Sequence, residues 1–379
     1  MFENTENNSF WKTGNGKDFL VWANIHEENL ISNYSTQLFL QYDDELETLT
    51  KGWLENGDFK TIMKSLHQNH ENKNLPLNYL KFKNNLYHVP NWVDFDLIQA
   101  GCKLSERSGL NGLLVLRNFA LLGGYNFANL TKPLVATGSL EKGAANRLYN
   151  TLNFWVEVSR SDKNAHDKRL NACMQTRLIH SASRLMIQKK HPEWNKDCYG
   201  EPINYADMIA TNIAFTVYYL YGLQKLNFNY SEKEELGVFH LWKYVTYLLG
   251  VPKELIPNNK IEALSFFHFW TKYQGQPDED AIKLSESLLN ENTPISMFKL
   301  DIIKRNMGYI HKSISNYLID GNIRQNLNIP EVRFKNIIPK AVQLKNQLII
   351  NTEREIQEGR ANQKSILNDY KNAITQQVI

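Results

Sequence analysis

The stretch 177–184, with the sequence RLIHSASR, carries the side chains best suited to chemistry in this chain. On a helix, one face would present Arg177, His180, Ser181 and Arg184, which are spaced i, i+3, i+4 and i+7. Burying a guanidinium costs several kcal/mol unless an anion lies beside it, and the stretch contains neither Asp nor Glu. The sequence therefore predicts a carboxylate from elsewhere in the fold, or a bound anion, next to the arginines.

His180 has two interpretations on this spacing. A single histidine on a largely apolar helix is more typical of a satisfied core residue than of a ligand. The flanking Arg177 and Arg184 shift the balance, because guanidiniums suit carboxylates or phosphates in fork geometry. A salt bridge from each arginine to a neighbouring helix is the competing interpretation.

A second polar group lies upstream, where Arg147 and Thr151 are spaced i and i+4 with Asn150 between them. A hydroxyl and an amide on one helix face can orient a small polar ligand. They can also bond back to their own helix, which is the commoner outcome.

Several other chemistries lack their motifs. The chain has no Glu-x-x-His pair for a carboxylate-bridged di-iron site and no His-Glu-x-x-His zinc motif. It has no Cys-x-x-Cys-His for covalent haem attachment. His240 and His268 lie among aromatic residues, which favours a core or substrate-wall role for both.

Composition predicts a large soluble domain. The chain has 379 residues, of which 42% are hydrophobic, and a net charge of +3 without a clustered basic stripe, so nucleic-acid binding is not expected. Three widely spaced cysteines suggest a reducing compartment. No apolar run reaches the roughly 20 residues of a membrane span, and the first residues do not resemble an export signal. We expect a cytoplasmic protein without a transmembrane segment.

Helical periodicity dominates the elements that must position these residues. Candidate N-caps are Ser139, Asn204 and Ser231, the last at capping-box spacing to Glu234. A weak strand pattern covers 79–83, and charged helices follow residue 334. The predicted helices span Ser105–Leu122, Leu140–Ser159, Asp167–Lys190, Tyr205–Leu226, Glu232–Leu249 and Ile261–Tyr273.

Several short motifs, in this order, resemble the latex clearing protein or rubber oxygenase family. They are PNWVD at 90–94, TGSL at 137–140, RLYNT at 147–151, RLIHSASR at 177–184 and LLGVP at 248–252. The same domain occurs in fungal oxygenases of the endoplasmic reticulum that cleave isoprenoid side chains. The resemblance implies a single all-α domain with a globin-like core over 85–275, an N-terminal extension over 1–84, and C-terminal helices over 276–379. Those last helices would pack on the core or form a homo-oligomer contact.

The resemblance also implies a non-covalent haem b. His180 matches the proximal iron ligand of the family, and Arg147 and Thr151 match a pair near the haem. Arg177 and Arg184 match flanking arginines, which we expect near the haem propionates.

This chain departs from the family pattern at the distal side. Asn150 stands where some rubber oxygenases have an iron-closing lysine, and Glu141 is a candidate for their upstream glutamate base. The resemblance implies that Arg147, Asn150 and Thr151 orient bound oxygen while an apolar, isoprenoid or lipid-like substrate is cleaved at a C=C bond with O2 into carbonyl products. A non-catalytic haem- or ligand-binding sensor or carrier is the alternative.

Overall fold

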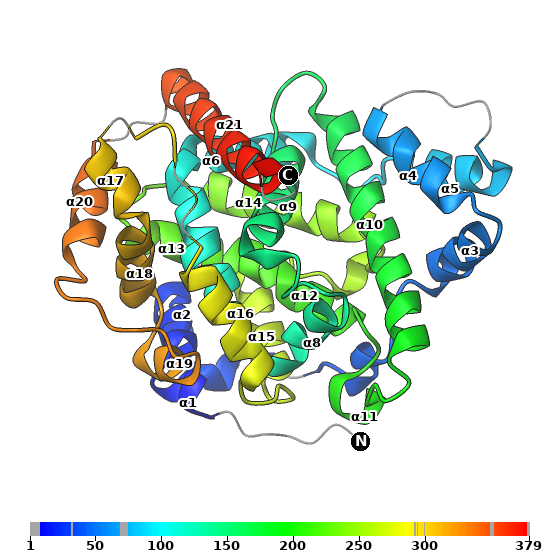
Figure 1. The fold of residues 1–379 in the computed structure, drawn as a ribbon, viewed down its shortest axis with the longest axis horizontal. Helices are drawn as coiled ribbons and strands as arrows, with labels where there is room; N and C mark the ends of the chain where they lie inside the picture. The colour runs from blue at the N-terminus through cyan, green and yellow to red at the C-terminus, as the bar shows by residue number, and fades with distance from the viewer. Residues whose placement is uncertain are drawn as a thin grey trace.

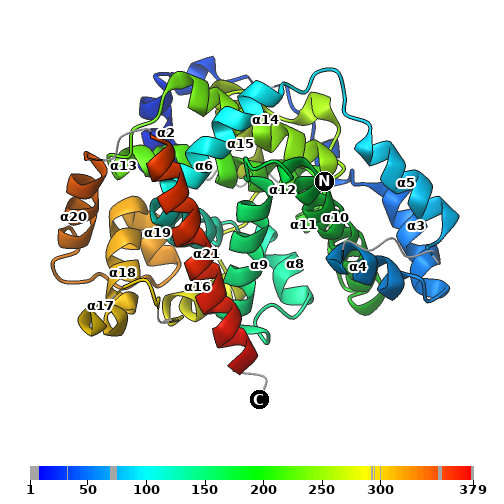
Figure 2. The ribbon, with the colours of Figure 1, turned by 90° about the horizontal axis from the view of Figure 1, so that it is seen from above.

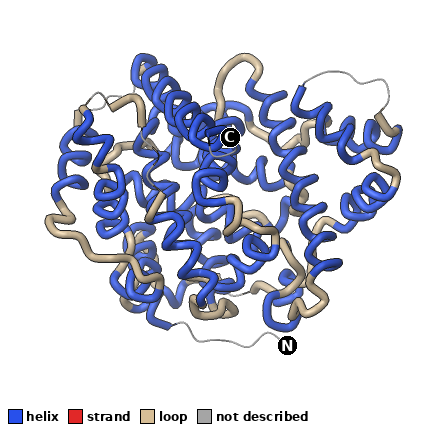
Figure 3. Tube along the Cα trace, in the orientation of Figure 1, coloured by secondary structure: helices blue, strands red, loops and turns tan. Residues whose placement is uncertain are grey.

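Helices make up the whole architecture of this protein (Figures 1 and 3). A computed structural model describes residues 8–31, 33–68, 75–291, 293, 295–298, 300–348 and 352–376, and these residues contain no strand. The all-α prediction is therefore confirmed. The strand pattern at 79–83 is wrong, because these residues lie in helix α5 (Leu77–Tyr87). Tyr79 and Phe82 are buried at helical spacing, three residues apart, against α3 and α4.

The central element is α6 (Phe95–Val115), which packs against α14 (Glu232–Leu248) and α21 (Glu353–Gln376). It begins ten residues before the predicted Ser105 start. Its Asp94 N-cap accepts hydrogen bonds from the backbone N–H groups of Asp96 and Leu97. The contact with α14 is a backbone contact, since a Cβ added to Gly101 would lie 2.3 Å from the Gly237 oxygen. Only glycine permits this approach.

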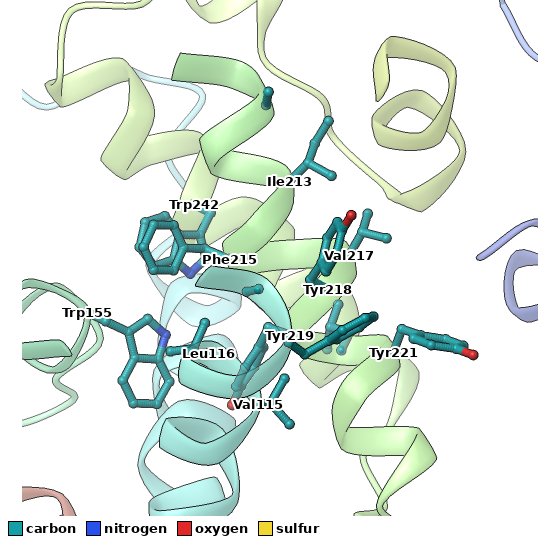
Figure 4. Close-up of a cluster of buried hydrophobic side chains, with 14 of the residues drawn as sticks. Val115, Leu116, Trp155, Ile213, Phe215, Val217, Tyr218, Tyr219, Tyr221 and Trp242 are labelled. Carbon is teal, nitrogen blue, oxygen red and sulfur yellow. The ribbon is translucent and has the colours of Figure 1, made fainter. Parts of the chain in front are cut away.

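Two π-helical segments meet in the core (Figure 4). They are Leu116–Leu121 (η3), which continues α6, and Ala214–Tyr218 (η4), between α12 (Tyr205–Ile213) and α13 (Tyr219–Lys225). The rings of Phe119 and Tyr218 are 4.7 Å apart, and Phe215 stacks on Trp242 at 4.1 Å.

The predicted helix bounds are met closely by α10 (Ala165–Lys190), by α14 and by α15 (Lys260–Thr271). The caps at Asn204 and Ser231 are confirmed, with a full capping box at Ser231. The Ser139 cap is wrong. Helix α9 (Gly143–Val158) begins four residues later, because the chain turns at Gly138 and Gly143 with φ values of 75° and 77°.

The N-terminal helices contribute to two hydrophobic clusters. Side chains of α1 (Asn8–Lys12) and α2 (Asn15–Ala23) join the main core, whereas α3 (Asp44–Glu55), α4 (Phe59–Gln68) and α5 form a smaller cluster with Met174 and Leu178 of α10. Figures 1 and 2 show α3, α4 and α5 at one edge of the molecule, beside α10. This smaller cluster therefore rests on the helix that carries His180.

The remaining helices complete the periphery. Figure 2 shows α21 crossing the molecule over α6 and α9, and Ile366, Leu367 and Tyr370 of α21 belong to the main core. The charged tail predicted after residue 334 is thus two helices, one of which is part of the core. The other helices are α7 (Leu122–Gly124), α8 (Ala128–Ala136), α11 (Lys196–Tyr199), α16 (Glu279–Leu289), α17 (Asp301–Arg305), α18 (Met307–Leu318), α19 (Gly321–Asn326) and α20 (Ile337–Asn346).

Candidate functional site

His180 lies just past the middle of α10 and is held as a neutral imidazole. Burial, with the nearby Arg184 guanidinium, lowers the pKa of His180 to about 4, and Asp43 opposes this shift. Its Nδ1 is buried and has no hydrogen-bond partner among the described residues, whereas the residue as a whole is half-buried. A neutral ring with an unsatisfied nitrogen is the form in which histidine binds metals.

Two carboxylates, from the N-cap residue of α3 and from its first turns, meet the arginines that flank His180. Arg177 donates to Asp43 through Nε at 2.5 Å and Nη2 at 2.9 Å, a bidentate pair. Arg184 donates from Nη1 to Glu47 at 3.0 Å, and to the carbonyl oxygens of Pro202 and Ile203. The sequence predicted either a protein carboxylate or a bound anion next to these arginines, and the structure shows protein carboxylates. Both arginines thus have protein carboxylates as partners, and their place near the haem propionates stays a prediction.

Aromatic rings cover both guanidiniums. The Phe82 ring of α5 lies 5.0 Å from the Arg177 guanidinium carbon, and Tyr42, just before α3, lies 4.6 Å from that of Arg184. The side chain of Arg184 is 1% exposed and that of Glu47 is 11% exposed, so this pair is largely removed from water. Removing one member of such a pair leaves an uncompensated buried charge.

Gly250 makes room for the first of these pairs. Its φ is +100°, and an added Cβ would lie 2.6 Å from Asp43 Oδ2 and 2.8 Å from Arg177 Nε. A side chain here would be strained and would also split the ion pair. The glycine of the LLGVP motif therefore leaves room for the Asp43–Arg177 ion pair beside the helix that carries His180.

Arg147 is the contrasting arginine. It lies in α9, which packs directly against α10, and it is 9% exposed. Its Nε, Nη1 and Nη2 are buried, no described residue meets them in full hydrogen-bond geometry, and the guanidinium lies 5.4 Å from the centre of the Tyr125 ring. Burial raises the pKa of Tyr125 to about 12, although the Arg147 guanidinium close to its hydroxyl opposes this shift, so the polar neighbour of Arg147 is a neutral phenol. A buried cation without an anion marks a place for a negatively charged ligand group.

The other predicted residues of α9 and α10 differ in their surroundings. Thr151 is half-buried, and its hydroxyl does not bond back to its own helix in the part of the chain described. Asn150 is exposed and donates to Asn146 Oδ1 at 3.1 Å. The Ser181 hydroxyl is buried without a hydrogen bond. Glu141 is exposed in the turn before α9. The oxygen-orienting and base roles of these residues stay predictions.

The sequence reasoning missed Asp43, Glu47 and Tyr125. Asp43 and Glu47 are spaced i and i+4, which places both on one helix face, as Arg177 and Arg184 are placed two turns apart on theirs. The two spacings differ, one turn for the carboxylates and two for the arginines, so the sequence alone did not indicate this pairing. Nothing near Tyr125 in the sequence indicates that its ring lies against Arg147.

His240 and His268 already have partners. His240 Nε2 accepts a hydrogen bond from the Asp94 backbone N–H, and His268 Nε2 lies 2.9 Å from Glu27. Among the described residues, no three His, Cys, Asp or Glu side chains converge as a metal site. An iron at His180 would therefore need most of its ligands from a group that the chain binds, such as the four nitrogens of a porphyrin.

No helix in the described part of the chain combines the length and the apolar character that a membrane crossing requires.

The architecture is that of a known class of helical oxygenase. The structure of latex clearing protein in its closed state superimposes with a TM-score of 0.69, covering 88% of this chain and 92% of that one. Sequence identity is 16%, so this likeness concerns the fold. No curated protein matches the sequence.

The family follows from the sequence itself. Residues 114–339, more than half of the chain, match the catalytic domain of the ER-bound oxygenase mpaB/B' and rubber oxygenase family. The chain belongs to this oxygenase family. The resemblance drawn from the short motifs is confirmed, and the match runs beyond residue 275 into the helices that follow the predicted core.

Proposed function

We propose that this protein is a haem b-dependent oxygenase that cleaves a C=C bond of an apolar, isoprenoid or lipid-like substrate with O2, giving carbonyl products. The observation that carries the proposal is one pair of unsatisfied groups on two packed helices. His180 of α10 presents a neutral imidazole with a free buried nitrogen, and Arg147 of α9 presents a buried guanidinium without an anion. Haem supplies an iron for the first and carboxylates for the second.

In this proposal each residue has a limited task. His180 would hold the iron, and its low pKa keeps the ring unprotonated over the physiological range. Arg147 would bind a negatively charged group of the cofactor. The Thr151 hydroxyl, which makes no hydrogen bond within the described residues, would donate one to a ligand bound near Arg147. Haem, when bound, supplies the activation of O2 and the oxidation of the alkene, while the protein provides orientation and apolar surroundings.

The first experiment is the absorption spectrum of the protein purified after haem supplementation. We expect a Soret band that His180→Ala abolishes or shifts strongly. His311→Ala is the matched control, because Nδ1 of His311 is also buried without a partner, yet His311 lies in α18 beside Arg117. Absence of a Soret band in the unmodified protein, or equal loss in both variants, would contradict the proposal.

A second measurement separates an oxygenase from a haem-binding sensor or carrier. Oxygen consumption is followed with isoprenoid substrates, and products are identified by mass. Two carbonyl fragments whose masses sum to the substrate plus one O2 would support cleavage. A stable haem complex without oxygen consumption would favour the sensor or carrier.

A further inference from the structure

Helix α20 presents an apolar stripe to the outside of the molecule. Ile337 and Leu344, 58% and 66% exposed, lie seven residues apart with the exposed Ala341 between them. At about 100° per residue these positions share one narrow face. Phe334, 75% exposed, precedes the helix, and Leu348, 80% exposed, follows it. Most apolar side chains on a soluble surface are scattered singly, so a continuous stripe of large ones indicates a binding surface.

The opposite face of α20 is fixed to the protein, so the stripe cannot turn inward. Buried Asn346 donates to the Leu226 carbonyl at 2.8 Å and bonds to Asn111 of α6. Gln343 donates to the Lys225 carbonyl and to the Tyr317 hydroxyl, each at 2.8 Å. Figures 1 and 2 both show α20 at the edge of the molecule, across from α3.

Positive charge surrounds the stripe. The segment from Val332 to Thr352 contains no Asp or Glu but has four basic residues. Lys340 and Lys345 are exposed and fall on the two sides of the stripe at 100° per residue. Lys335 pairs with Glu331, whereas Arg333, Lys340 and Lys345 form no ion pair with the described residues. A lysine-flanked apolar face is the pattern of helices that lie in the surface of an anionic bilayer.

We propose that α20 docks this protein on anionic lipid membranes, with the stripe at the level of the acyl chains and the lysines among the headgroups. A second copy of the chain is a poorer occupant, because a two-fold contact would bring the lysines of both copies together. This proposal is independent of the haem at His180.

The test is co-sedimentation of the full chain with phosphatidylcholine vesicles, with and without phosphatidylglycerol. We expect binding to the anionic vesicles that weakens as salt is raised. The double variant I337Q/L344Q should lose it, and K340Q/K345Q should weaken it by about tenfold or more. Val21→Gln is the matched control, since Val21 of α2 is 73% exposed and lies outside the stripe. All of these positions are exposed, so the variants should fold, which circular dichroism checks.

Three results would overturn the proposal. The unmodified protein may stay in the supernatant with both kinds of vesicle. The Val21→Gln variant may lose binding as fully as I337Q/L344Q does. Sedimentation equilibrium may instead show a dimer that I337Q/L344Q dissolves, without vesicle binding, which would make the stripe a contact between copies of the chain.

Discussion

At the scale of single residues, the three arginines of the site behave in two different ways. Arg177 and Arg184 are neutralised by Asp43 and Glu47, and aromatic rings cover both. Arg147 has a ring but no anion. All three look alike in the sequence, since each lies on a helix without a nearby acidic partner. The difference depends on which distant segment packs against each helix, and residue spacing does not carry that information.

We predict that Arg147→Met stabilises the haem-free protein by about 1–3 kcal/mol, because it removes a buried group without a hydrogen-bond partner while keeping most of the side-chain volume. The same variant should bind haem more weakly than the unmodified protein. Urea unfolding of the haem-free form and a haem titration measure the two effects.

The control for this prediction is Arg184→Met. It leaves Glu47 buried without its cation, so a loss of about 3–5 kcal/mol is expected. If Arg147→Met destabilised the haem-free protein as strongly as Arg184→Met, Arg147 would be a structural residue with a partner in solution.

At the scale of elements, α3 holds α10 on both sides of His180. The two ion pairs are joined by the smaller hydrophobic cluster, in which Leu46 and Trp53 of α3 pack with Met174 and Leu178 of α10. This arrangement restrains α10 on both sides of the imidazole, which would keep His180 oriented if it binds a metal as we propose.

We predict that Glu47→Gln lowers the free energy of unfolding by about 3 kcal/mol, because Arg184 keeps its backbone carbonyl partners but loses its carboxylate. The variant should also lower haem affinity, because α10 is less restrained. Chemical denaturation and a haem titration check this. Glu45→Gln, an exposed change on the same helix, should alter neither quantity, and an equal effect of both changes would contradict the role of the ion pair.

The starts of helices were predictable where the N-cap residue and the residues that follow it indicate the same boundary. The capping box at Ser231 and the Asn204 cap fixed the starts of α14 and α12. Prediction failed at Ser139, where the glycines at 138 and 143 extend the turn, and at 79–83, where burial at helical spacing outweighs a weak alternating pattern. The π-helical segments have no local signature, because they depend on the fit between Phe119 and Tyr218 across the core.

At the scale of the whole molecule, the structure ties the C-terminal helix to the catalytic domain. The family match ends at residue 339, but α21 lies against α6 and α9. Gln363 donates to the Ser105 carbonyl at 2.8 Å, and Arg360 pairs with Glu106 at 2.7 Å. The last helix of the described chain, α21, therefore packs on α6 and α9.

We predict that a chain ending at Thr352 loses cooperative folding. It would expose the surfaces that Ile366, Leu367 and Tyr370 cover, and each such burial contributes about 1.5–3 kcal/mol to a total of about 5–15 kcal/mol. The truncated chain should show a broad thermal transition and weak near-ultraviolet circular dichroism.

A point variant keeps this prediction testable if the truncated chain is insoluble. Ile366→Ala should cost about 2–4 kcal/mol. Arg354→Ala should cost little, because its pair with Glu358 is exposed. Unchanged melting of the Ile366→Ala variant would show that α21 is dispensable.

The unpaired guanidinium of Arg147 also bears on how long the protein survives in a cell. A helix that keeps a buried charge without an anion opens more readily than its neighbours, and proteases cleave such transiently opened segments in proportion to how often they open. If haem supplies the anion, its binding would make proteolysis at α9 rarer. A ligand that binds the folded state lowers the population of open forms. Chains that had acquired their cofactor would then outlast those that had not, and the amount of enzyme would follow the supply of haem.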